Sequence, residues 1–452
     1  MTPKPIMSVS GLRGIVGTSL TPQLIQRFTA AYLRFLDDAD IPGPLIVGRD
    51  GRDSGSDIAE QIQTIITSHG RDVFYGGILA TPSLGIQIRQ QQAAGGIQIT
   101  ASHNPLPYNG MKLYSPQGQI LNQAQADQVL QNYQNRLDPT SSATESGSQA
   151  TQLSKPHDPH LKALLETIDV TAIQQSAFHV LLDSNHGAGS PLGIRLLQHL
   201  NCQLTLLGET PDGQFSHPPE PTAQNLQSVA QHVLTESCDI GFCQDPDADR
   251  LALIDEQGRY IGEEYTLALC IEQRLTESPG NVVINCASSG MNHQIAEAHQ
   301  CSCYESAVGE ANVVEKMIAT GAVFGGEGNG GPIDPLVGLI RDSFVGIVRV
   351  LDLMARRDQS LSEIVRTLPT CSIHKATREV GDFDLAAGLQ SLPEQFPDAE
   401  PDWTDGLKLR WKDGRWLILR PSNTEPLVRA IAEAPTLPQA VQMCEQALNA
   451  LD

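Results

Sequence analysis

Short runs of consecutive apolar residues alternate along the chain with longer stretches in which apolar residues recur every three or four positions. The short runs are typical of strands and the longer stretches are typical of helices. In the first third of the chain this pattern predicts a strand at 44–48, a helix at 57–69 and a strand at 72–75. Because such strands are apolar on both faces, they favour mostly parallel sheets covered by helices on both sides.

The same unit recurs twice more with little sequence identity. Strands and helices of these two repeats are predicted at residues 179–183, 191–200, 203–206, 281–285, 292–299 and 302–304. We therefore expect three α/β domains of one type.

The end of the chain has a different pattern. Two apolar runs at 407–411 and 415–419 flank Lys412-Asp413-Gly414, which predicts a hairpin with a tight turn. An amphipathic helix is predicted at 436–451. This combination favours a smaller α+β domain.

One segment, residues 140–154, is rich in Ser, Thr and Gln and poor in apolar residues, which predicts a loop or linker. The expected fold class is α/β, with three similar mixed, mostly parallel α/β domains and a smaller C-terminal α+β domain around a central cleft. The expected domain boundaries are 1–150, 151–256, 257–370 and 371–452.

Length and charge narrow the functional class. A chain of 452 residues is too long for one core and fits three or four domains. A formal net charge of −22 disfavours nucleic acid and anionic membrane as partners. The nine cysteines have irregular spacings, which indicates reduced thiols instead of a disulfide framework or a zinc site.

The first residues lack the apolar core of a signal peptide, and no run approaches the roughly 18 apolar residues that span a bilayer. We therefore expect a cytoplasmic enzyme.

Candidate chemistry begins with Ser102, in the segment Thr100-Ala101-Ser102-His103-Asn104-Pro105. This segment follows a strand-like run at 95–99, and loops at strand ends carry chemistry in α/β folds. A serine hydroxyl is a weak nucleophile unless a neighbour activates it. Taken alone, the segment is also explained by a polar turn.

A second polar loop contains Asp245, Asp247 and Asp249 between two apolar runs. Three closely spaced carboxylates favour a hard divalent cation, Mg²⁺ or Ca²⁺. A calcium loop of the EF-hand type is excluded because Arg250 stands where that loop needs glycine and because the flanks are strand-like. An aspartyl nucleophile at Asp245 or Asp247 and a structural acidic turn stay open as alternatives.

Two further loops complete the set. The glycine-rich segment 325–331 offers Glu327 and Asn329 as partners for hydroxyl groups, although a flexible turn also explains it. The segment 420–426 combines a guanidinium with small polar side chains, which suits an anion such as phosphate, although a polar turn also explains it. Walker and dinucleotide fingerprints are absent, so the phosphate is not expected to belong to ATP or NAD.

Together the four loops resemble the α-D-phosphohexomutase family. Similar segments extend over nearly the whole chain in the family's order: 10–17, 48–54, 109–112, 183–189, 219–222 and 308–313. Four motifs with the right spacing are far more specific than any one of them.

The resemblance implies a phosphohexose mutase in which Ser102 is phosphorylated and passes its phosphoryl group through a bisphosphorylated sugar, which also acts as activator. One Mg²⁺ per chain would be bound by Ser102 and the three aspartates. His103 and Lys112 are candidates to move the hydroxyl proton, and Arg13 to steady the transferring group. The expected substrate contacts are Arg250, Glu327, Asn329, Arg420, Ser422, Asn423, Thr424 and Arg429. The expected partners are small sugar phosphates, with a monomer or homodimer as the assembly.

The sugar loop departs from the family pattern. Many members carry Ser and a closing His where this chain has Asn329 and Gly331, so the second acid–base group is not assigned. Together with the segment 420–426, this loop resembles members that act on glucosamine phosphate and members with mixed mannose and glucose specificity. Phosphoglucosamine mutase is the preferred prediction because Glu425 would pair with a substrate ammonium, and phosphomannomutase/phosphoglucomutase is the alternative. A serine-dependent sugar phosphatase and a catalytically silent binding protein stay open as hypotheses from other classes.

Overall fold

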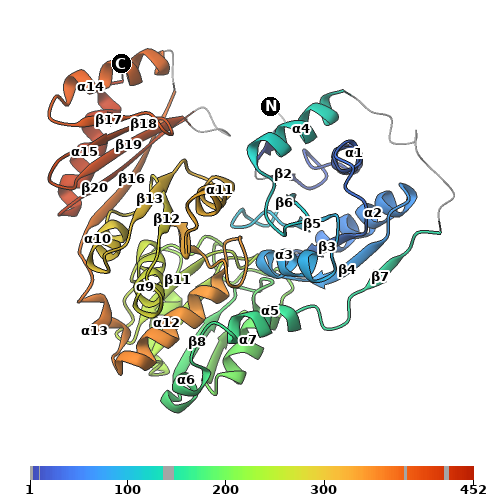
Figure 1. Ribbon diagram of the computed structural model, residues 1–452, viewed down its shortest axis with the longest axis horizontal. Helices are drawn as coiled ribbons and strands as arrows, with labels where there is room; N and C mark the ends of the chain where they lie inside the picture. The colour runs from blue at the N-terminus through green and yellow to red at the C-terminus, as the bar shows by residue number, and fades with distance from the viewer. Residues whose placement is uncertain (1–3, 10, 136–146, 381–383, 422–426, 452) are drawn as a thin grey trace. The chain divides into compact units, whose positions relative to one another are not determined.

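The computed structural model describes residues 4–9, 11–135, 147–380, 384–421 and 427–451 (Figure 1). The chain forms two compact units. Unit 1 comprises residues 1–273 and 329–365, and unit 2 comprises residues 274–328 and 366–452.

The first sheet of unit 1 has seven strands in the order β1-β2-β6-β5-β3-β4-β7. Its strands are β1 (Ile6–Ser8), β2 (Gly11–Ile15), β3 (Leu45–Arg49), β4 (Val73–Ile78), β5 (Gly95–Ile99), β6 (Tyr108–Tyr114) and β7 (Ala150–Gln152). β3 is parallel to β4 and β5, whereas β6 is antiparallel to β5 and β2. The helices of this region are α1 (Pro22–Asp38), α2 (Gly55–Ser68), α3 (Thr81–Gln90) and α4 (Gln123–Gln134).

Helices cover both faces of this sheet (Figure 1). Leu45 and Val47 of β3 belong to the core that contains α1, α2 and α4, whereas Ile46 packs with Leu84 and Ile88 of α3. Since successive strand residues point to opposite faces, a strand between two helical layers must be apolar at every position. This explains the continuous apolar run from which the strand was predicted.

The second sheet has the order β11-β10-β8-β9, with β11 antiparallel to β10 and the other pairs parallel. Its strands are β8 (His179–Asp183), β9 (Gln203–Leu207), β10 (Ile240–Gln244) and β11 (Leu251–Asp255). The other elements assigned mainly to unit 1 are α5 (Asp158–Leu165), α6 (Val170–Ser176), α7 (Ser190–His199), α8 (Gln227–Thr235), α9 (Glu263–Glu277), β15 (Gly331–Ile333), α12 (Ser343–Arg357) and α13 (Leu361–Val365).

Unit 2 contains two sheets. In the first, β12 (Val282–Asn285) is parallel to both β13 (Cys303–Ser306) and β14 (Phe324–Glu327). The helices of this part are α10 (Met291–Ala298) and α11 (Glu310–Thr320).

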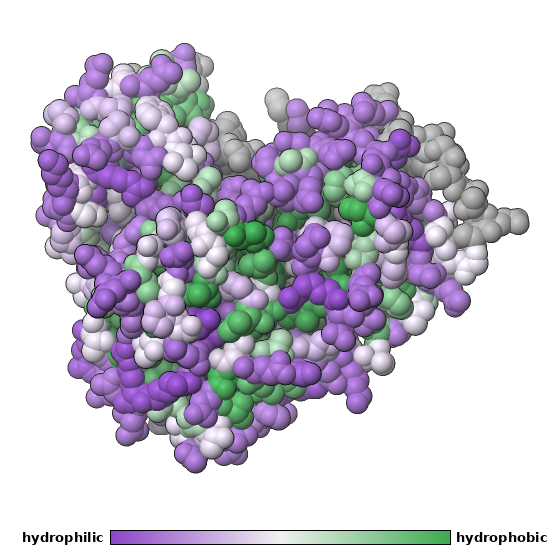
Figure 2. Space-filling view, viewed as in Figure 1, coloured by the Kyte–Doolittle hydropathy of each residue, from purple (hydrophilic) through white to green (hydrophobic). Residues whose placement is uncertain are grey.

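The C-terminal sheet of unit 2 is antiparallel, in the order β16-β20-β19-β18-β17. Its elements are β16 (Ser372–Glu379), α14 (Leu385–Gln395), β17 (Glu400–Asp402), β18 (Leu407–Arg410), β19 (Trp416–Pro421), β20 (Leu427–Ala434) and α15 (Leu437–Asn449). The predicted hairpin is confirmed as β18 and β19. Hydrophilic residues cover most of the visible face of this region, as expected for an acidic chain (Figure 2).

The predicted fold class is confirmed, with three α/β regions followed by a smaller α+β region. The loop prediction for 140–154 is wrong at residues 150–152, which form β7 on the edge of the first sheet next to β4. All three residues of β7 are exposed, so no apolar pattern marks this strand. Among the described residues, no helix has the length and apolar character to cross a membrane.

Candidate functional site

Two strand ends of unit 1 bring the serine loop and the acidic loop together. Ser102 follows β5, and Asp245 follows β10, each at the carboxyl end of its strand. The Ser102 hydroxyl donates a hydrogen bond to Asp245 Oδ2 over 2.9 Å. Both side chains are buried, although the two residues are 143 positions apart.

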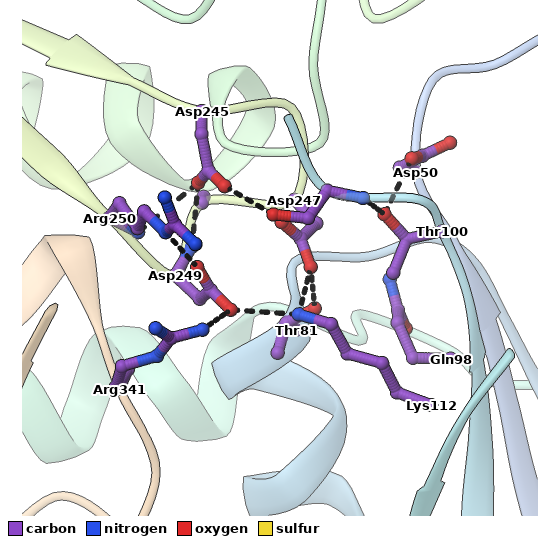
Figure 3. Close-up of polar contacts among 12 residues, drawn as sticks. Asp50, Thr81, Gln98, Thr100, Lys112, Asp245, Asp247, Asp249, Arg250 and Arg341 are labelled. Atoms are coloured by element: carbon purple, nitrogen blue, oxygen red, sulfur yellow. Dashed lines mark hydrogen bonds and ion pairs between the residues drawn. The ribbon is translucent and has the colours of Figure 1, made fainter. Parts of the chain in front are cut away.

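Ser102 has an unusual backbone conformation, with a left-handed φ of 49°. A non-glycine residue in this region costs roughly 1–2 kcal/mol, so neighbouring contacts must hold it there. Its amide N–H donates to Thr100 Oγ1 over 2.9 Å, and the Thr100 hydroxyl donates to Asp50 Oδ2 over 2.7 Å (Figure 3).

The three aspartates of the acidic loop are fully buried and bring one carboxylate oxygen each within 4.8 Å of one another. Asp245 Oδ1 accepts hydrogen bonds from the backbone N–H groups of Asp249 and Arg250, both over 3.1 Å. Ala248 completes the turn with a left-handed φ of 57°. The carboxylate of Asp245 thus holds the loop closed around itself.

The carboxylate oxygens of this loop have the character of a cation site. Asp247 Oδ1 and Asp249 Oδ1 are buried and accept no hydrogen bond, although Arg250 Nε lies 3.8 Å from Asp249 Oδ1. A buried carboxylate oxygen without a hydrogen bond is costly, whereas hard oxygen donors in this number suit Mg²⁺. The residues present therefore fit a divalent cation held by Asp245, Asp247 and Asp249 beside the Ser102 hydroxyl.

Cationic side chains border the acidic loop (Figure 3). Lys112 on β6 donates through Nζ to Asp247 Oδ2 over 2.6 Å and to Asp249 Oδ2 over 2.7 Å. Arg341 donates to the same Asp249 oxygen over 2.6 Å, and the Thr81 hydroxyl donates to Asp247 Oδ2 over 2.6 Å. Asp247 and Asp249 thus each have one oxygen tied to protein groups, whereas both oxygens of Asp245 accept hydrogen bonds.

The proton affinities of the carboxylates differ along the loop. Burial, together with the charges of Asp247 and Asp249, raises the pKa of Asp245 well above its usual value. Burial would also raise the pKa of Asp249, but the charges of Arg341, Lys112 and Arg250 outweigh it and lower that pKa. A bound cation would favour the charged form of all three.

His103 lies beside Ser102, and Arg13 lies close enough to His103 to act on its charge. The His103 Nδ1 atom is 3.3 Å from Ser102 Oγ, and the tautomer decides which of the two donates. The charge of Arg250, burial and the charge of Arg13 lower the pKa of His103 to about 2, so the imidazole is neutral near pH 7. Arg13 on β2 donates to Asn104 Oδ1 over 3.0 Å.

Other predicted site residues lie in unit 2. Glu327 ends β14, and its Oε1 accepts from Asn285 Nδ2 over 2.8 Å and from the Gly309 N–H over 3.0 Å. Arg420 on β19 and Arg429 on β20 stand directly opposite each other in the sheet. The predicted residues Ser422, Asn423, Thr424 and Glu425 lie outside the described residues.

Asn329 and Gly331, the two positions at which the sugar loop departs from the family pattern, belong to unit 1. A Cβ atom at Gly331 would lie 2.4 Å from Arg341 Cδ, so the arginine stem occupies the space that a larger residue would need.

Sequence reasoning missed Arg341 and Thr81 as neighbours of the acidic loop. Arg341 is 92 positions from Asp249, and no local motif marks it. Thr81 is the first residue of α3, and its local sequence is that of an ordinary helix start.

Comparison with known proteins agrees with this arrangement. The chain matches four domain models of the phosphoglucomutase/phosphomannomutase family. Alpha/beta/alpha domain I matches residues 4–139, domain II residues 158–258, domain III residues 263–371 and the C-terminal domain residues 384–450. A phosphoglucomutase/phosphomannomutase from Thermococcus kodakarensis is 32% identical over 98% of this chain and 97% of its own length. A probable phosphoglucosamine mutase from Methanopyrus kandleri is 28% identical over 97% of this chain and 95% of its own length.

A solved structure has the same fold. The crystal structure of a phosphoglucomutase/phosphomannomutase family protein from Burkholderia thailandensis aligns with a TM-score of 0.84 at 24% identity, covering 99% of this chain and 98% of that one. These matches extend over the whole architecture, including both loops that meet at Ser102. The chain belongs to the phosphoglucomutase/phosphomannomutase family, whose members are phosphohexose mutases.

Proposed function

We propose that this protein interconverts hexose 6-phosphate and hexose 1-phosphate through a phosphorylated Ser102 and a bisphosphorylated sugar. The observation that carries the proposal is the hydrogen bond between Ser102 Oγ and Asp245 Oδ2 inside a buried cluster of three carboxylates. Burial of the serine supports a carrier that keeps its phosphoryl group from water.

The proposed chemistry is a transfer between oxygens. The bond between Ser102 Oγ and phosphorus breaks and its electron pair stays on the serine oxygen, while a bond forms between phosphorus and a sugar hydroxyl oxygen. The hydroxyl proton passes to a base, and the serine oxygen takes up a proton to restore its hydroxyl. His103 is our candidate base because of its position, with Nδ1 3.3 Å from Ser102 Oγ. Its lowered pKa makes the free imidazole a weak base, and the negative charge of a phosphoryl group on Ser102 would raise that pKa. The second transfer reverses these steps with the other phosphate of the bisphosphorylated sugar.

The other residues would position groups and balance charge, as phosphoryl transfer requires. Mg²⁺ bound by the three aspartates would neutralise the charge of the transferring group. The charges of Arg13 and Arg250 lower the pKa of His103, and both guanidinium groups would also stabilise the transferring phosphoryl group. Lys112 would orient Asp247 and Asp249, to which it already donates.

Unit 2 would contribute recognition of the sugar and of the phosphate that does not react. Arg420 and Arg429 stand directly opposite each other on β19 and β20, where two guanidinium groups could pair with one phosphate. Arg420 Nε already has Asp405 Oδ1 as an ion-pair partner over 2.8 Å, so a phosphate would add to that contact. Glu327 would accept a hydrogen bond from a sugar hydroxyl.

The preferred substrate is glucosamine phosphate, with the mannose and glucose phosphates as the alternative. Relatives carry both kinds of name, so they support the reaction class more than the sugar. The test is a side-by-side assay with glucosamine 6-phosphate, mannose 1-phosphate and glucose 1-phosphate, each primed with its bisphosphate and with Mg²⁺ present.

Conversion of glucosamine 6-phosphate at least tenfold faster than of the others is the expected result. A preference for mannose or glucose phosphate would instead establish the alternative. Steady release of inorganic phosphate would identify a phosphatase. Binding without turnover and without phosphoserine would identify a silent binding protein.

A further inference from the structure

The turn after β3 contains a buried arginine that the proposed chemistry does not use. Arg52 is only 1% exposed. Its Nη1 donates to the carbonyl oxygens of Pro105 and Tyr108 over 2.9 and 3.0 Å. Its Nη2 donates to the carbonyl oxygens of Ser102 and Asn104 over 2.7 and 2.5 Å. One guanidinium therefore binds four carbonyl groups of the serine loop, residues 102–108.

The remaining guanidinium donor is also used. Arg52 Nε donates to Asp50 Oδ2 over 3.1 Å, and the Arg52 backbone N–H donates to Asp50 Oδ1 over 2.9 Å. A guanidinium has five N–H donors in a planar fork, and here each has an acceptor. The ammonium of a lysine is a point charge with three donors, so it could not replace this pattern.

Stability alone is a poor explanation for this residue. Replacing a buried ion pair by apolar residues of similar volume is often neutral or stabilising, so a buried pair is weak evidence for a role in stability. The acceptors of Arg52 are also concentrated on one loop. This distribution indicates that the arginine determines the shape of that loop.

A loop from the second sheet region of unit 1 covers Arg52 from the other side. The Phe215 ring centre lies 5.0 Å from the Arg52 Cζ atom. Beside it, a Cβ atom at Gly213, whose φ is +72°, would lie 2.7 Å from the Gly51 carbonyl oxygen. The two backbones thus pack directly on each other, and the guanidinium has little room to move.

We propose that Arg52 is a positioning residue that fixes the left-handed backbone of Ser102 and thereby directs its hydroxyl at the acidic loop. Thr100 holds the Ser102 amide and Arg52 holds the Ser102 carbonyl. Both holding residues are anchored on Asp50, whose contact with Thr100 is drawn in Figure 3. The inference rests on the proposed function, because it assigns Arg52 a part in phosphorylation of Ser102.

The test compares Arg52→Lys with Arg349→Lys. Arg349 is an equally buried arginine of unit 1 that donates to Asp334 and Gln273, away from the serine loop. For Arg52→Lys we expect kcat to fall at least tenfold, with KM for the sugar monophosphate within twofold of wild type. Transfer of phosphate from the bisphosphorylated sugar to Ser102 should slow by a similar factor.

Amide hydrogen exchange separates positioning from general destabilisation. In Arg52→Lys, exchange should accelerate in a peptide covering 100–108 and stay unchanged in one covering 245–250. In Arg349→Lys, exchange at 100–108 should match wild type even if the melting temperature falls. Wild-type turnover and exchange in Arg52→Lys would overturn the proposal, and so would an equal loss of kcat in Arg349→Lys.

A second variant covers the case in which Arg52→Lys does not fold. Asp50→Asn keeps the side-chain volume but weakens the anchor of both Arg52 and Thr100, so a smaller loss of kcat and faster exchange at 100–108 are expected. Unchanged kcat and exchange in that variant would overturn the proposal. If the wild-type protein shows no mutase activity, the proposed function fails, whereas the exchange measurement still tests whether Arg52 holds the loop.

Discussion

The hydroxyl of Ser102 is buried, as the proposed role of phosphoryl carrier requires. A phosphoserine that water reaches easily would lose its phosphate between the two transfers. The neighbours of Ser102 are a neutral imidazole and a carboxylate that burial and its neighbours make hard to ionise. The proposed transfer would therefore depend on a bound cation and on fixed positions more than on a strong base.

Substitution of the serine tests this dependence. Ser102→Ala removes the acceptor atom of the phosphoryl group, so kcat/KM should fall at least a thousandfold, about 4 kcal/mol of transition-state stabilisation. Intact-mass analysis should find a phosphorylated fraction in the wild-type protein that the variant lacks. Near wild-type turnover in a folded variant would contradict the mechanism.

The three aspartates should behave as one cation site. Asp247→Asn or Asp249→Asn should raise the Mg²⁺ concentration needed for half-maximal activity, and the double variant should lose less than the product of the single effects. The reason is that either change already leaves an incomplete set of oxygens. EDTA should abolish activity, and excess Mg²⁺ should restore it. Activity that survives EDTA would assign the loop a purely structural role.

Gly331 is expected to be intolerant of a side chain. Gly331→Ala would force the Arg341 stem away from its position, at a cost of roughly 1–3 kcal/mol, and would disturb the ion pair with Asp249. Both the melting temperature and the Mg²⁺ affinity should fall. Gly147→Ala is the matched control, since nothing lies within 4 Å of a Cβ atom there. Equal behaviour of the two variants would rule out steric control by Arg341.

Local motifs predicted some site residues and could not predict others. Ser102 and the three aspartates occur in short polar segments directly after apolar runs, so sequence order alone indicates them. Arg341, Thr81 and Arg52 reach the site through long-range packing. Their roles depend on which backbone lies opposite, and that information is distributed over the whole fold.

Among the secondary structure elements, the buried ones were the most predictable. The strand predicted at 179–183 coincides with β8, whose residues Val180 to Asp183 are buried. The edge strands β1 and β7 were not predicted. The described residues of β1 are half-buried and those of β7 are exposed, so neither carries a continuous apolar signal. The four-domain boundaries stay a prediction.

An ion-pair network connects β13 with β18 inside unit 2. Glu305 Oε2 accepts from Lys408 Nζ over 2.9 Å and from Arg410 Nη2 over 2.7 Å. Burial would raise the pKa of Glu305, but its contacts with His293, Arg410 and Lys408 outweigh burial and lower that pKa. The folded state therefore favours the charged carboxylate.

This lowered pKa predicts the direction of a pH effect. The stabilisation by Glu305 should be complete above the unfolded-state pKa of about 4.3 and should be lost progressively as the pH falls from there towards the lowered pKa of the folded state. Glu305→Gln should remove this contribution and destabilise unit 2 at pH 7 by about 3 kcal/mol, because Lys408 stays buried without its carboxylate. Unfolding of both proteins by urea from pH 7 to pH 3 measures this effect.

The exposed Glu394 of α14 provides the control for that measurement. Glu394→Gln should unfold with the pH dependence of the wild-type protein. If Glu305→Gln does the same, the network does not contribute to the stability of unit 2.

At the scale of the whole molecule, the negative net charge is unfavourable for the approach of a negatively charged sugar phosphate. A formal charge of −22 repels a sugar phosphate at long range. Recognition must therefore come from local cations such as Arg13, Arg250 and Arg341, which lie close enough to influence one another or His103.

The path of the chain between the two units has a consequence for protein synthesis. Unit 1 is interrupted after residue 273, resumes at 329 and ends at 365. Arg341, which pairs with Asp249, is therefore synthesised 92 residues after it. Until then the nascent chain contains the three aspartates of the acidic loop but lacks the arginine side chain that pairs with Asp249 in the folded protein. We infer that the acidic loop reaches its final form only after about three quarters of the chain has been translated. A chain whose synthesis ends earlier would lack Arg341 and therefore the complete acidic loop.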